Sequence, residues 1–466
     1  MREAGSSTRL VLAGVGHANL EVLRRFSSSA LAGVDLTVIS PGPLHLYSGM
    51  VPGYLRGTYR VEEIAVEVAP LVRDAGGRLL LGRAVGLDSH RRLVKVTGGV
   101  DETATSAADA SAREGDGVRE VPYDLVAFAV GSDAIGAAAA SARGAGAVLS
   151  CKPIGKAIEL RRRLDLLAGD SQPPATVAVV GGGAAGVEIA LAAVGRLQAS
   201  AVGRLQASAA GRLGTPAAGR LQASPAGRLG TSVAAGRGTQ ATGHRVLLLE
   251  AGATILADRS PRLRRRAEQV LERRGVELRT GAKVVDVSSP GEAAAPPSRA
   301  VLRLGSGEEI SCDLVIWVTA ATGWPLFREA GLPLDDREFL LVDDTLRSIA
   351  DPRVFAAGDC ATLTAFPGTA KAGVYAVREG PVLARGLRAA LAGEEPPRYR
   401  PQRGFLVILN TGDGRALLSY KGFVSYSRWA FRLKDTIDRR FVAKYRRRRR
   451  TESTGEERRN GSSGGI

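Results

Sequence analysis

The stretch VAVVGGGAAGVE, Val177 to Glu188, decides the fold of this chain. An apolar run typical of a buried strand leads into G-x-G-x-x-G at Gly181, Gly183 and Gly186, and a helical pattern follows. Glycines in this context let a pyrophosphate approach the backbone at a helix N-terminus, because no Cβ obstructs it. The stretch therefore predicts a strand-turn-helix unit that holds a dinucleotide.

A weaker copy of the same pattern lies near the N-terminus, in LVLAGVGHAN at Leu10 to Asn19. It keeps Gly14 and Gly16 but has Asn19 in the third place, where glycine normally allows close packing of the helix on the strand. Alone, this copy would be hard to distinguish from an ordinary glycine turn. Two copies in one chain predict two dinucleotide sites.

The ribose of a dinucleotide usually bonds an acidic side chain about 20 residues after the glycines. Glu250, at the end of the strand-like RVLLLE, lies 69 residues after Gly181, but GRL recurs with a period of eight from Gly195 to Gly227. Setting aside the 46 residues 195–240 leaves a spacing of 23. The repeat has too few apolar residues for a core, so we interpret it as a disordered surface insertion that at most lengthens the preceding helix.

Composition and charge indicate one enzyme-sized chain without a membrane span. The 466 residues are 44% hydrophobic, with no apolar run of 18 and no secretory signal, so we expect a cytoplasmic protein. The net charge is +17, of which residues 195–245 and 428–459 carry +15. A nucleic-acid surface across the fold is therefore not indicated, and the basic C-terminal stretch is either a solvated tail or a contact with an anionic membrane.

The few cysteines and histidines limit the chemistry further. Cys151, Cys312 and Cys360 form no C-x-x-C pair, which argues against a short-spaced redox disulfide. Four histidines without clustered ligands give no support for a metal site.

Three further stretches complete a familiar order: VPYDLVAFAVGS at 121–132, CDLVIWVTAATGWP at 312–325 and RVFAAGDCATL at 353–363. With the two glycine turns, they resemble the pyridine nucleotide-disulfide oxidoreductase superfamily. The resemblance implies an FAD site at Gly14, Gly16, His17, Asn19, Ser40, Gly131, Gly358 and Asp359. It implies an NAD(P)H site at Gly181, Gly183, Gly186, Glu250 and Gly323.

Several of these positions leave alternatives open. Ser40 stands where relatives commonly have a ribose-binding acid, and His17 can equally serve helix-terminal packing. The Glu250 carboxylate favours NADH over NADPH because it would repel a 2′-phosphate, although Arg245, Arg259 and Arg262 are near in sequence and can soften the preference.

SPGPLHLYSGMVPGYL at 40–55, AKAGVYAVREGPVLARGL at 370–387 and WAFRLKDTIDRRF at 429–441 look like a narrower group. This group comprises type II NADH dehydrogenase-like proteins, some of them fused to selenide, water dikinase. The resemblance implies that hydride passes from NADH to FAD and that electrons then reach a quinone-like acceptor. Glu188 and Lys371 are the candidate catalytic residues. A helix-dipole role for Glu188 and a surface role for Lys371 remain alternatives.

The fold class that follows is α/β, with two Rossmann-like dinucleotide-binding domains, the second inserted in the first, and a C-terminal α+β segment. We expect the FAD domain at 1–135 and 321–390 and the NAD(P)H domain at 136–320. The segment 391–445 would serve homodimer contact or peripheral membrane attachment, and 446–466 would be a disordered basic tail.

Two other functions stay open. A flavoprotein of sulfur or selenium metabolism would need a cysteine beside the flavin, for which Cys360 is the candidate. A flavin-binding interaction protein would use the basic tail to bind membrane or nucleic acid, but the intact second fingerprint argues against vestigial redox chemistry.

Overall fold

The computed structural model describes residues 7–29, 31–101, 117–144, 146–169, 173–212, 243–289 and 299–446. The insertion beyond residue 212, up to 242, and the tail from 447 onward lie outside these ranges, so the predictions of disorder there stay predictions. Among the described helices, none is both long and apolar enough to cross a bilayer.

The first sheet has seven strands in the order β20-β8-β1-β2-β5-β6-β7. Its parallel part combines β20 (Val354–Ala356), β8 (Leu125–Phe128), β1 (Thr8–Ala13), β2 (Val34–Ser40) and β5 (Arg78–Asp88). Two antiparallel strands, β6 (Leu93–Asp101) and β7 (Val118–Pro122), extend it. The apolar strands β1 and β8 lie deep in the core because helices and loops cover both faces of a parallel sheet.

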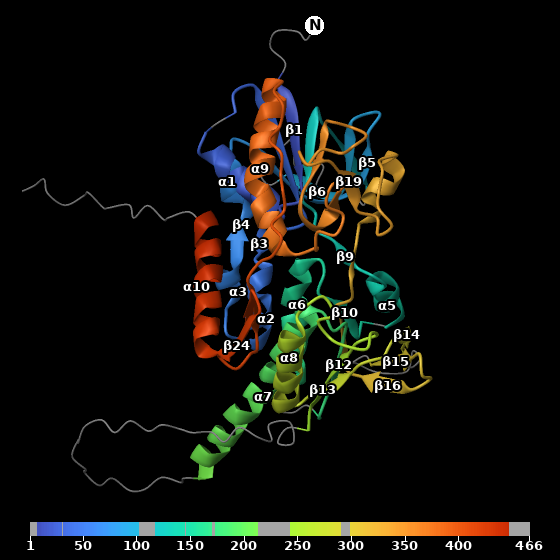
Figure 1. The fold of residues 1–466 in the computed structure, drawn as a ribbon, viewed down its shortest axis with the longest axis vertical. Coiled ribbons are helices and arrows are strands. Elements are labelled where there is room, and N and C mark those ends of the chain that lie inside the picture. The colour runs from blue at the N-terminus through green and yellow to red at the C-terminus, as the bar shows by residue number, and fades with distance from the viewer. Residues whose placement is uncertain are drawn as a thin grey trace, which may run out of the picture.

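The second sheet is fully parallel, in the order β10-β17-β11-β12-β13. Its strands are β10 (Val148–Ser150), β17 (Leu314–Trp317), β11 (Thr176–Val180), β12 (Arg245–Leu249) and β13 (Val276–Arg279). The helices of this unit are α5 (Ala137–Arg143), α6 (Ala157–Leu167), α7 (Ala184–Arg212) and α8 (Pro261–Arg274). An antiparallel sheet of β14 (Val284–Ser288), β15 (Ala300–Leu304) and β16 (Glu309–Cys312) lies at its edge (Figure 1).

The chain crosses between the two units twice, and the crossings lie side by side. β9 (Asp133–Ala134) pairs antiparallel with β18 (Ala321–Thr322). Figure 1 shows β9 between the upper and lower parts of the molecule. β20, from the returning segment, completes the first sheet beside β8. Both crossings fall next to the expected domain limits, and the division into domains itself stays a prediction.

Helices α1 (His17–Ser27) and α9 (Gly373–Ala392) pack together over the first sheet (Figure 1). Smaller elements join this unit: β3 (Leu44–Leu46), α2 (Val51–Arg56), α3 (Val61–Ile64), β4 (Ala65–Glu67), α4 (Val68–Asp74), β19 (Leu340–Val342) and β21 (Ala361–Leu363). The 3-10 turns are η1 (Ser48–Met50), η3 (Ile154–Lys156), η4 (Pro325–Ala330) and η5 (Gly358–Cys360).

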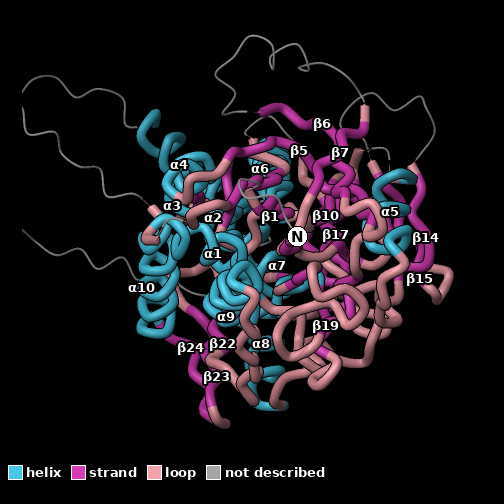
Figure 2. The backbone as a smooth tube through the Cα atoms, turned by 90° about the horizontal axis from the view of Figure 1, so that it is seen from above, coloured by secondary structure: helices cyan, strands magenta, loops and turns pink. Residues whose placement is uncertain are grey.

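The C-terminal segment is α+β: β22 (Val407–Asn410), β23 (Ala416–Tyr420) and β24 (Phe423–Ser427) form an antiparallel sheet, and α10 (Arg428–Tyr445) follows. Figure 2 shows α10 at the side of the molecule where α1 and α3 lie. With two parallel βα units and this segment, the α/β fold class expected from the sequence is confirmed.

The first copy of the eight-residue repeat belongs to the folded unit. Helix α7 runs through it, Leu197 is buried, and the Arg196 guanidinium bonds Asp165 on α6. The expected lengthening of the preceding helix is therefore confirmed for this copy, whereas the prediction that it lies outside the core is wrong at Leu197. The reason is that a leucine placed at helical spacing after an apolar helix can still join the core.

Candidate functional site

Four of the predicted FAD positions follow the carboxyl ends of neighbouring strands. Gly358 follows β20, Gly131 follows β8, Gly14 follows β1, and Ser40 ends β2, and these strands are adjacent in the sheet. Ligands of open α/β sheets bind outside the carboxyl ends of the strands, so the sheet gathers residues that are more than 300 positions apart.

The first glycine turn brings α1 close to β8. Gly14 has φ +79°, and a Cβ added to Gly16 would lie 2.4 Å from the Ala129 carbonyl oxygen. Asn19, in the third place of the pattern, is fully buried, and its Nδ2 donates to the carbonyls of Gly14 at 2.8 Å and Ala127 at 3.0 Å. The amide thus ties the helix to both strands, which explains how the turn dispenses with a third glycine.

Asp359 lies beside two residues that sequence reasoning missed. Its Oδ2 accepts from Ser132 Oγ at 3.1 Å and pairs with Lys152 Nζ at 3.3 Å, and Lys152 Nζ also lies 2.5 Å from Ser132 Oγ. Lys152 comes from the loop after β10, in the other unit. The position of Ser132 in the turn VGS after a strand could have predicted that it lies at the site. Nothing in the sequence connects Lys152 with Asp359.

Gly358 is held by a buried carboxyl. Its N–H donates to Glu379 Oε2 at 2.5 Å, and burial raises the pKa of Glu379 to about 7. Around Gly131 a Cβ would meet nothing within 4 Å, so this turn faces open space. The bare turns, the Asp359 carboxylate and this open space fit an FAD molecule.

Ser40 and His17 are in place but are engaged with protein partners. Ser40 is buried, and its Oγ donates to the Gly42 carbonyl at 2.7 Å. His17 opens α1 within an aromatic cluster: its ring centroid lies 5.0 Å from that of His45, 5.5 Å from Tyr47 and 5.4 Å from Phe441. Burial lowers the pKa of His17 to about 4, so the ring is neutral and suits the packing role.

The second glycine turn has the geometry of a dinucleotide fingerprint. A Cβ at Gly186 would lie 1.8 Å from the Gly181 carbonyl oxygen, so only glycine lets α7 start this close to β11. At Gly183 a Cβ would meet nothing within 4 Å, so the middle of the turn is open. Glu250 Oε2 accepts from Gly182 N at 2.6 Å, which places the carboxylate against the turn as the corrected spacing predicts.

The other residues expected around NAD(P)H are arranged differently. Arg245 begins β12, opposite the end that bears Glu250, and pairs with Glu277, so its expected influence on the ribose side is wrong. Arg259 pairs with Asp258 and lies over the Phe405 ring. Gly323 packs against the backbone at Glu338, where a Cβ would lie 1.9 Å from the carbonyl oxygen, so it has a packing role apart from any cofactor.

Glu188 lies where the second unit meets the C-terminal segment. Its Oε1 accepts from Asn410 N on β22 at 2.7 Å, and burial raises its pKa to about 7. The charges of Lys434 and Asp438 on α10 act on this carboxyl. Lys434 Nζ donates to the Gly49 carbonyl at 2.8 Å and to Asp438 at 2.9 Å, and the Tyr47 hydroxyl also bonds Asp438. The sequence had no signal for this cluster, since α10 is far away along the chain.

Lys371 is not a surface lysine. It precedes α9, and its Nζ donates to Thr362 Oγ1 at 2.8 Å and to the Ala361 carbonyl, over the Phe339 ring. Burial lowers its pKa. Lys371 lines a small cavity with Gly358, Asp359 and Glu379, and therefore lies by the expected FAD site.

The cysteines offer no activated thiol. Cys360 is fully buried, its Sγ contacts the Ala357 carbonyl at 3.3 Å, and burial raises its pKa to about 11. Cys151 and Cys312 are likewise buried free thiols. A thiol kept protonated in this way is a poor nucleophile, which removes support from the sulfur or selenium alternative. Across the described ranges, no group of three or more His, Cys, Asp or Glu is arranged to hold a metal ion.

Comparison with known proteins agrees with this geometry. The family model for pyridine nucleotide-disulphide oxidoreductases matches residues 8–380. An NADH dehydrogenase-like protein of Mycobacterium tuberculosis is 28% identical over 373 residues, which cover 76% of this chain and 73% of that protein. A type II NADH:quinone oxidoreductase of the same organism is 26% identical over 200 residues, 41% of each chain.

Solved structures share the fold at low identity. NDH2 of Plasmodium falciparum in complex with NADH superposes with a TM-score of 0.66 at 12% identity, covering 94% of this chain and 97% of that chain. The sulfide:quinone oxidoreductase of Aquifex aeolicus gives a TM-score of 0.63 at 15% identity, with 94% and 92% covered.

Proposed function

Because this chain belongs to the pyridine nucleotide-disulphide oxidoreductase family, as a type II NADH dehydrogenase-like NAD(P)H oxidoreductase, we propose that it uses FAD to transfer electrons from NADH to a quinone-like acceptor. Bound FAD supplies the chemistry that links a two-electron hydride donor to the acceptor. The protein has to hold both nucleotides, exclude water and manage protons.

Two sets of residues would hold the nucleotides. The turn at Gly14 and Gly16, with the α1 N-terminus, would receive the FAD pyrophosphate. Asp359, which lies next to Ser132 and Lys152, would bind the polyol end of FAD. The turn at Gly181, Gly183 and Gly186 would receive the NADH pyrophosphate.

The placement of Glu188 is the observation that supports the acceptor assignment best. Reduction of a quinone to a quinol takes up two protons with two electrons, so the site needs a group that carries a proton near neutral pH. With its pKa raised to about 7 by burial, Glu188 meets that requirement. Asp438 on α10 and Tyr47 lie in the same polar cluster as Glu188 and would connect Glu188 to the C-terminal segment.

Lys371 would act as a fixed positive charge beside the FAD site. Its Nζ is anchored by Thr362 and the Ala361 carbonyl, so it cannot swing out into solvent without losing both hydrogen bonds. A cation held there would stabilise negative charge that develops on the adjacent cofactor.

Anaerobic stopped-flow of the purified yellow protein would test the proposal. We expect NADH to bleach the flavin absorbance and a short-chain quinone to restore it within the turnover time. Bleaching without restoration by quinone would refute the acceptor, and no bleaching by NADH or NADPH would refute the flavin-dependent reaction.

Glu188→Gln separates the two half-reactions. Since the Gln amide keeps the acceptor for Asn410 N but cannot deliver a proton, we expect reoxidation by quinone to slow by about 10²-fold while bleaching by NADH changes little. The exposed Glu272→Gln on α8 is the matched control and should alter neither rate.

A further inference from the structure

We propose that four arginines around Gly57 and Gly195 form a binding site for the phosphate group of a small soluble molecule, separate from both dinucleotide turns. They are Arg56 at the end of α2, Arg161 on α6, Arg196 on α7 and Arg274 at the end of α8. α2, α6 and α8 all pack against α7, as can be followed in Figure 1.

Two glycines let the four guanidinium groups approach the backbone and one another, because a side chain at either position would meet them. A Cβ at Gly57 would lie 3.4 Å from Arg196 Nη1 and 3.6 Å from Arg161 Nη1. A Cβ at Gly195 would lie 2.5 Å from Arg56 Nε and 3.3 Å from Arg274 Nη2. Each glycine is therefore approached by a pair of arginines, and Gly57 is exposed to solvent.

The described surroundings do not neutralise the four charges. Asp165 pairs with Arg161 at 2.8 Å and Arg196 at 2.5 Å. Asp413, the other carboxylate near Arg56, is engaged with the hydroxyls of Thr411 and Tyr426. Four guanidinium groups thus face one directly paired carboxylate within the described part of the chain.

The protein uses some of the donors in this cluster and leaves another without an acceptor in the described ranges. Arg56 Nε donates to the Gly412 carbonyl at 2.8 Å, while Arg274 Nε is buried with no partner in the described ranges. Burial, and then the charges of Arg274 and Arg196, lower the pKa of Arg56. Like charges that are partly withdrawn from water are costly unless an anion compensates them. The planar guanidinium fork matches phosphate oxygens in bidentate fashion, which favours a phosphate over a halide.

The site is distinct from the NADH turn. Arg196 lies 12 residues beyond Ala184 along α7, about 18 Å at the rise of an α-helix. It belongs to the first copy of the eight-residue repeat, so the proposal gives that copy a role. The site does not depend on the electron acceptor, and either proposal can fail without the other.

Calorimetric titration with inorganic pyrophosphate would test the site. The full chain is used with FAD bound and NAD⁺ saturating, so that both dinucleotide sites are occupied, and ionic strength is matched with NaCl. We expect one saturable site per chain. Arg56→Gln and Arg274→Gln should each weaken binding by about tenfold or more, because each removes charge-assisted hydrogen bonds. Arg274→Lys, which keeps the charge, should weaken it less.

The exposed Arg273→Gln on the same turn of α8 is the matched control and should bind as the wild type does. Flavin bleaching by NADH at the wild-type rate would show that each variant is folded. No saturable heat, or equal binding by all variants, would overturn the site. Binding to phosphatidic acid vesicles that requires Arg274, without binding of pyrophosphate, would overturn the soluble ligand in favour of a lipid headgroup.

Discussion

At the scale of single residues, two buried carboxyl groups differ in pKa because their hydrogen-bond and ion-pair partners differ. Glu21 is surrounded by cations and its pKa falls to about 2, whereas Glu188 accepts one backbone hydrogen bond and its pKa rises to about 7. Burial opposes charge in both cases, and only the partners of Glu21 outweigh it. A carboxyl left in the second condition can exchange a proton at neutral pH, which suits a reaction that consumes protons.

The raised pKa of Glu188 predicts a pH-dependent stability. The folded chain keeps the proton up to about pH 7, while the unfolded chain releases it near 4.5, so stability is lost as pH rises through that window. We expect Glu188→Gln to raise the unfolding temperature at pH 8 by a few degrees and to leave it unchanged at pH 4. Differential scanning calorimetry at both pH values measures this. An equal shift at both values would contradict the assignment.

Glu250 predicts the choice of nucleotide. Its carboxylate is fixed against the second glycine turn by Gly182 N and Gly252 N, where it would repel a 2′-phosphate. We expect Glu250→Gln to raise the ratio of kcat/KM for NADPH to that for NADH by about tenfold. Steady-state kinetics with both nucleotides check this, with the exposed Glu309→Gln as control. An unchanged ratio would show that another group selects the nucleotide.

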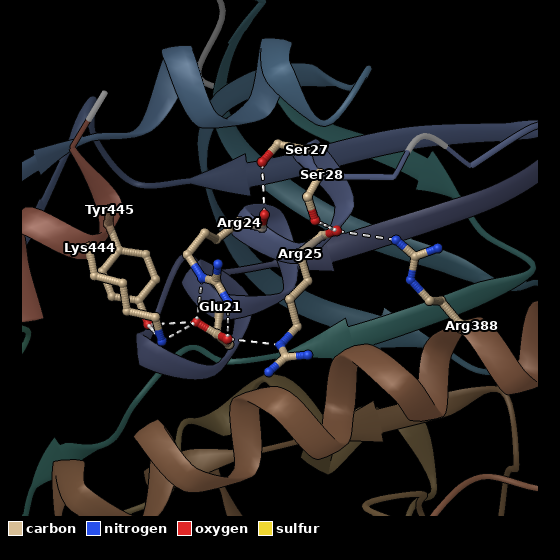
Figure 3. A network of polar contacts seen from close by, with 8 residues as sticks. All are labelled: Glu21, Arg24, Arg25, Ser27, Ser28, Arg388, Lys444 and Tyr445. Carbon is tan, nitrogen blue, oxygen red and sulfur yellow. Dashed lines mark hydrogen bonds and ion pairs between the residues drawn. The ribbon is translucent and has the colours of Figure 1, made fainter. Parts of the chain in front are cut away.

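At the scale of elements, helix α10 is held against α1 by ion pairs and hydrogen bonds. Its last turn reaches α1, where the Glu21 carboxylate accepts from Arg24, Arg25, Lys444 and the Tyr445 hydroxyl (Figure 3). Lys434 fastens the middle of α10 to η1 through the Gly49 carbonyl. Because Tyr47 and Phe441 stack between these contacts, α10 closes one side of the region that contains His17.

Glu21→Gln tests the fastening of α10. Replacing this buried carboxylate leaves three partly exposed cations without their partner, so we expect a loss of about 2 kcal/mol in the free energy of unfolding at pH 7. The stabilisation by the ionised Glu21 carboxylate is fully present above the unfolded pKa of 4.5 and is lost as pH falls through the folded pKa of about 2. The difference in free energy of unfolding between variant and wild type, measured by urea unfolding, should therefore become smaller below pH 4.5. Tyr445→Phe, which removes one hydrogen bond, should cost about 1 kcal/mol. A loss of the same size at pH 3 and pH 7 would contradict the ionic origin.

The surface distribution of apolar residues matters at the scale of the whole molecule. Trp429, Leu433 and Ile437 follow one another at helical spacing on α10 and are 49%, 37% and 43% exposed. Phe423, on the neighbouring β24, is 57% exposed. Arg432 and Arg440 are exposed on the same helix. An apolar face flanked by cations suits the interface of an anionic membrane, which is also where a quinone-like acceptor would be found.

We predict that Trp429→Ser, Leu433→Ser and Ile437→Ser together weaken binding to anionic vesicles by at least about tenfold, since each removes apolar area that vesicle binding would bury. Flotation of the protein with phosphatidylglycerol vesicles measures the binding. Leu166→Ser on α6, which is 53% exposed elsewhere, is the matched control. If the triple variant floats as the wild type does, and sedimentation shows a dimer for the wild type but not for the variant, this face would instead be the contact with a second copy of the chain.

The sequence by itself determined the α/β class, the two glycine turns and the pairing of Glu250 with the second turn, because these follow from local patterns and short spacings. The first repeat was misjudged because burial of Leu197 depends on what packs against α7. Only the tertiary structure decided the partners of Asp359, the contacts of Glu188 with the C-terminal segment, and the arginine cluster. These arise where elements far apart in the chain meet, and side-chain protonation depends on such neighbours rather than on the sequence around each residue.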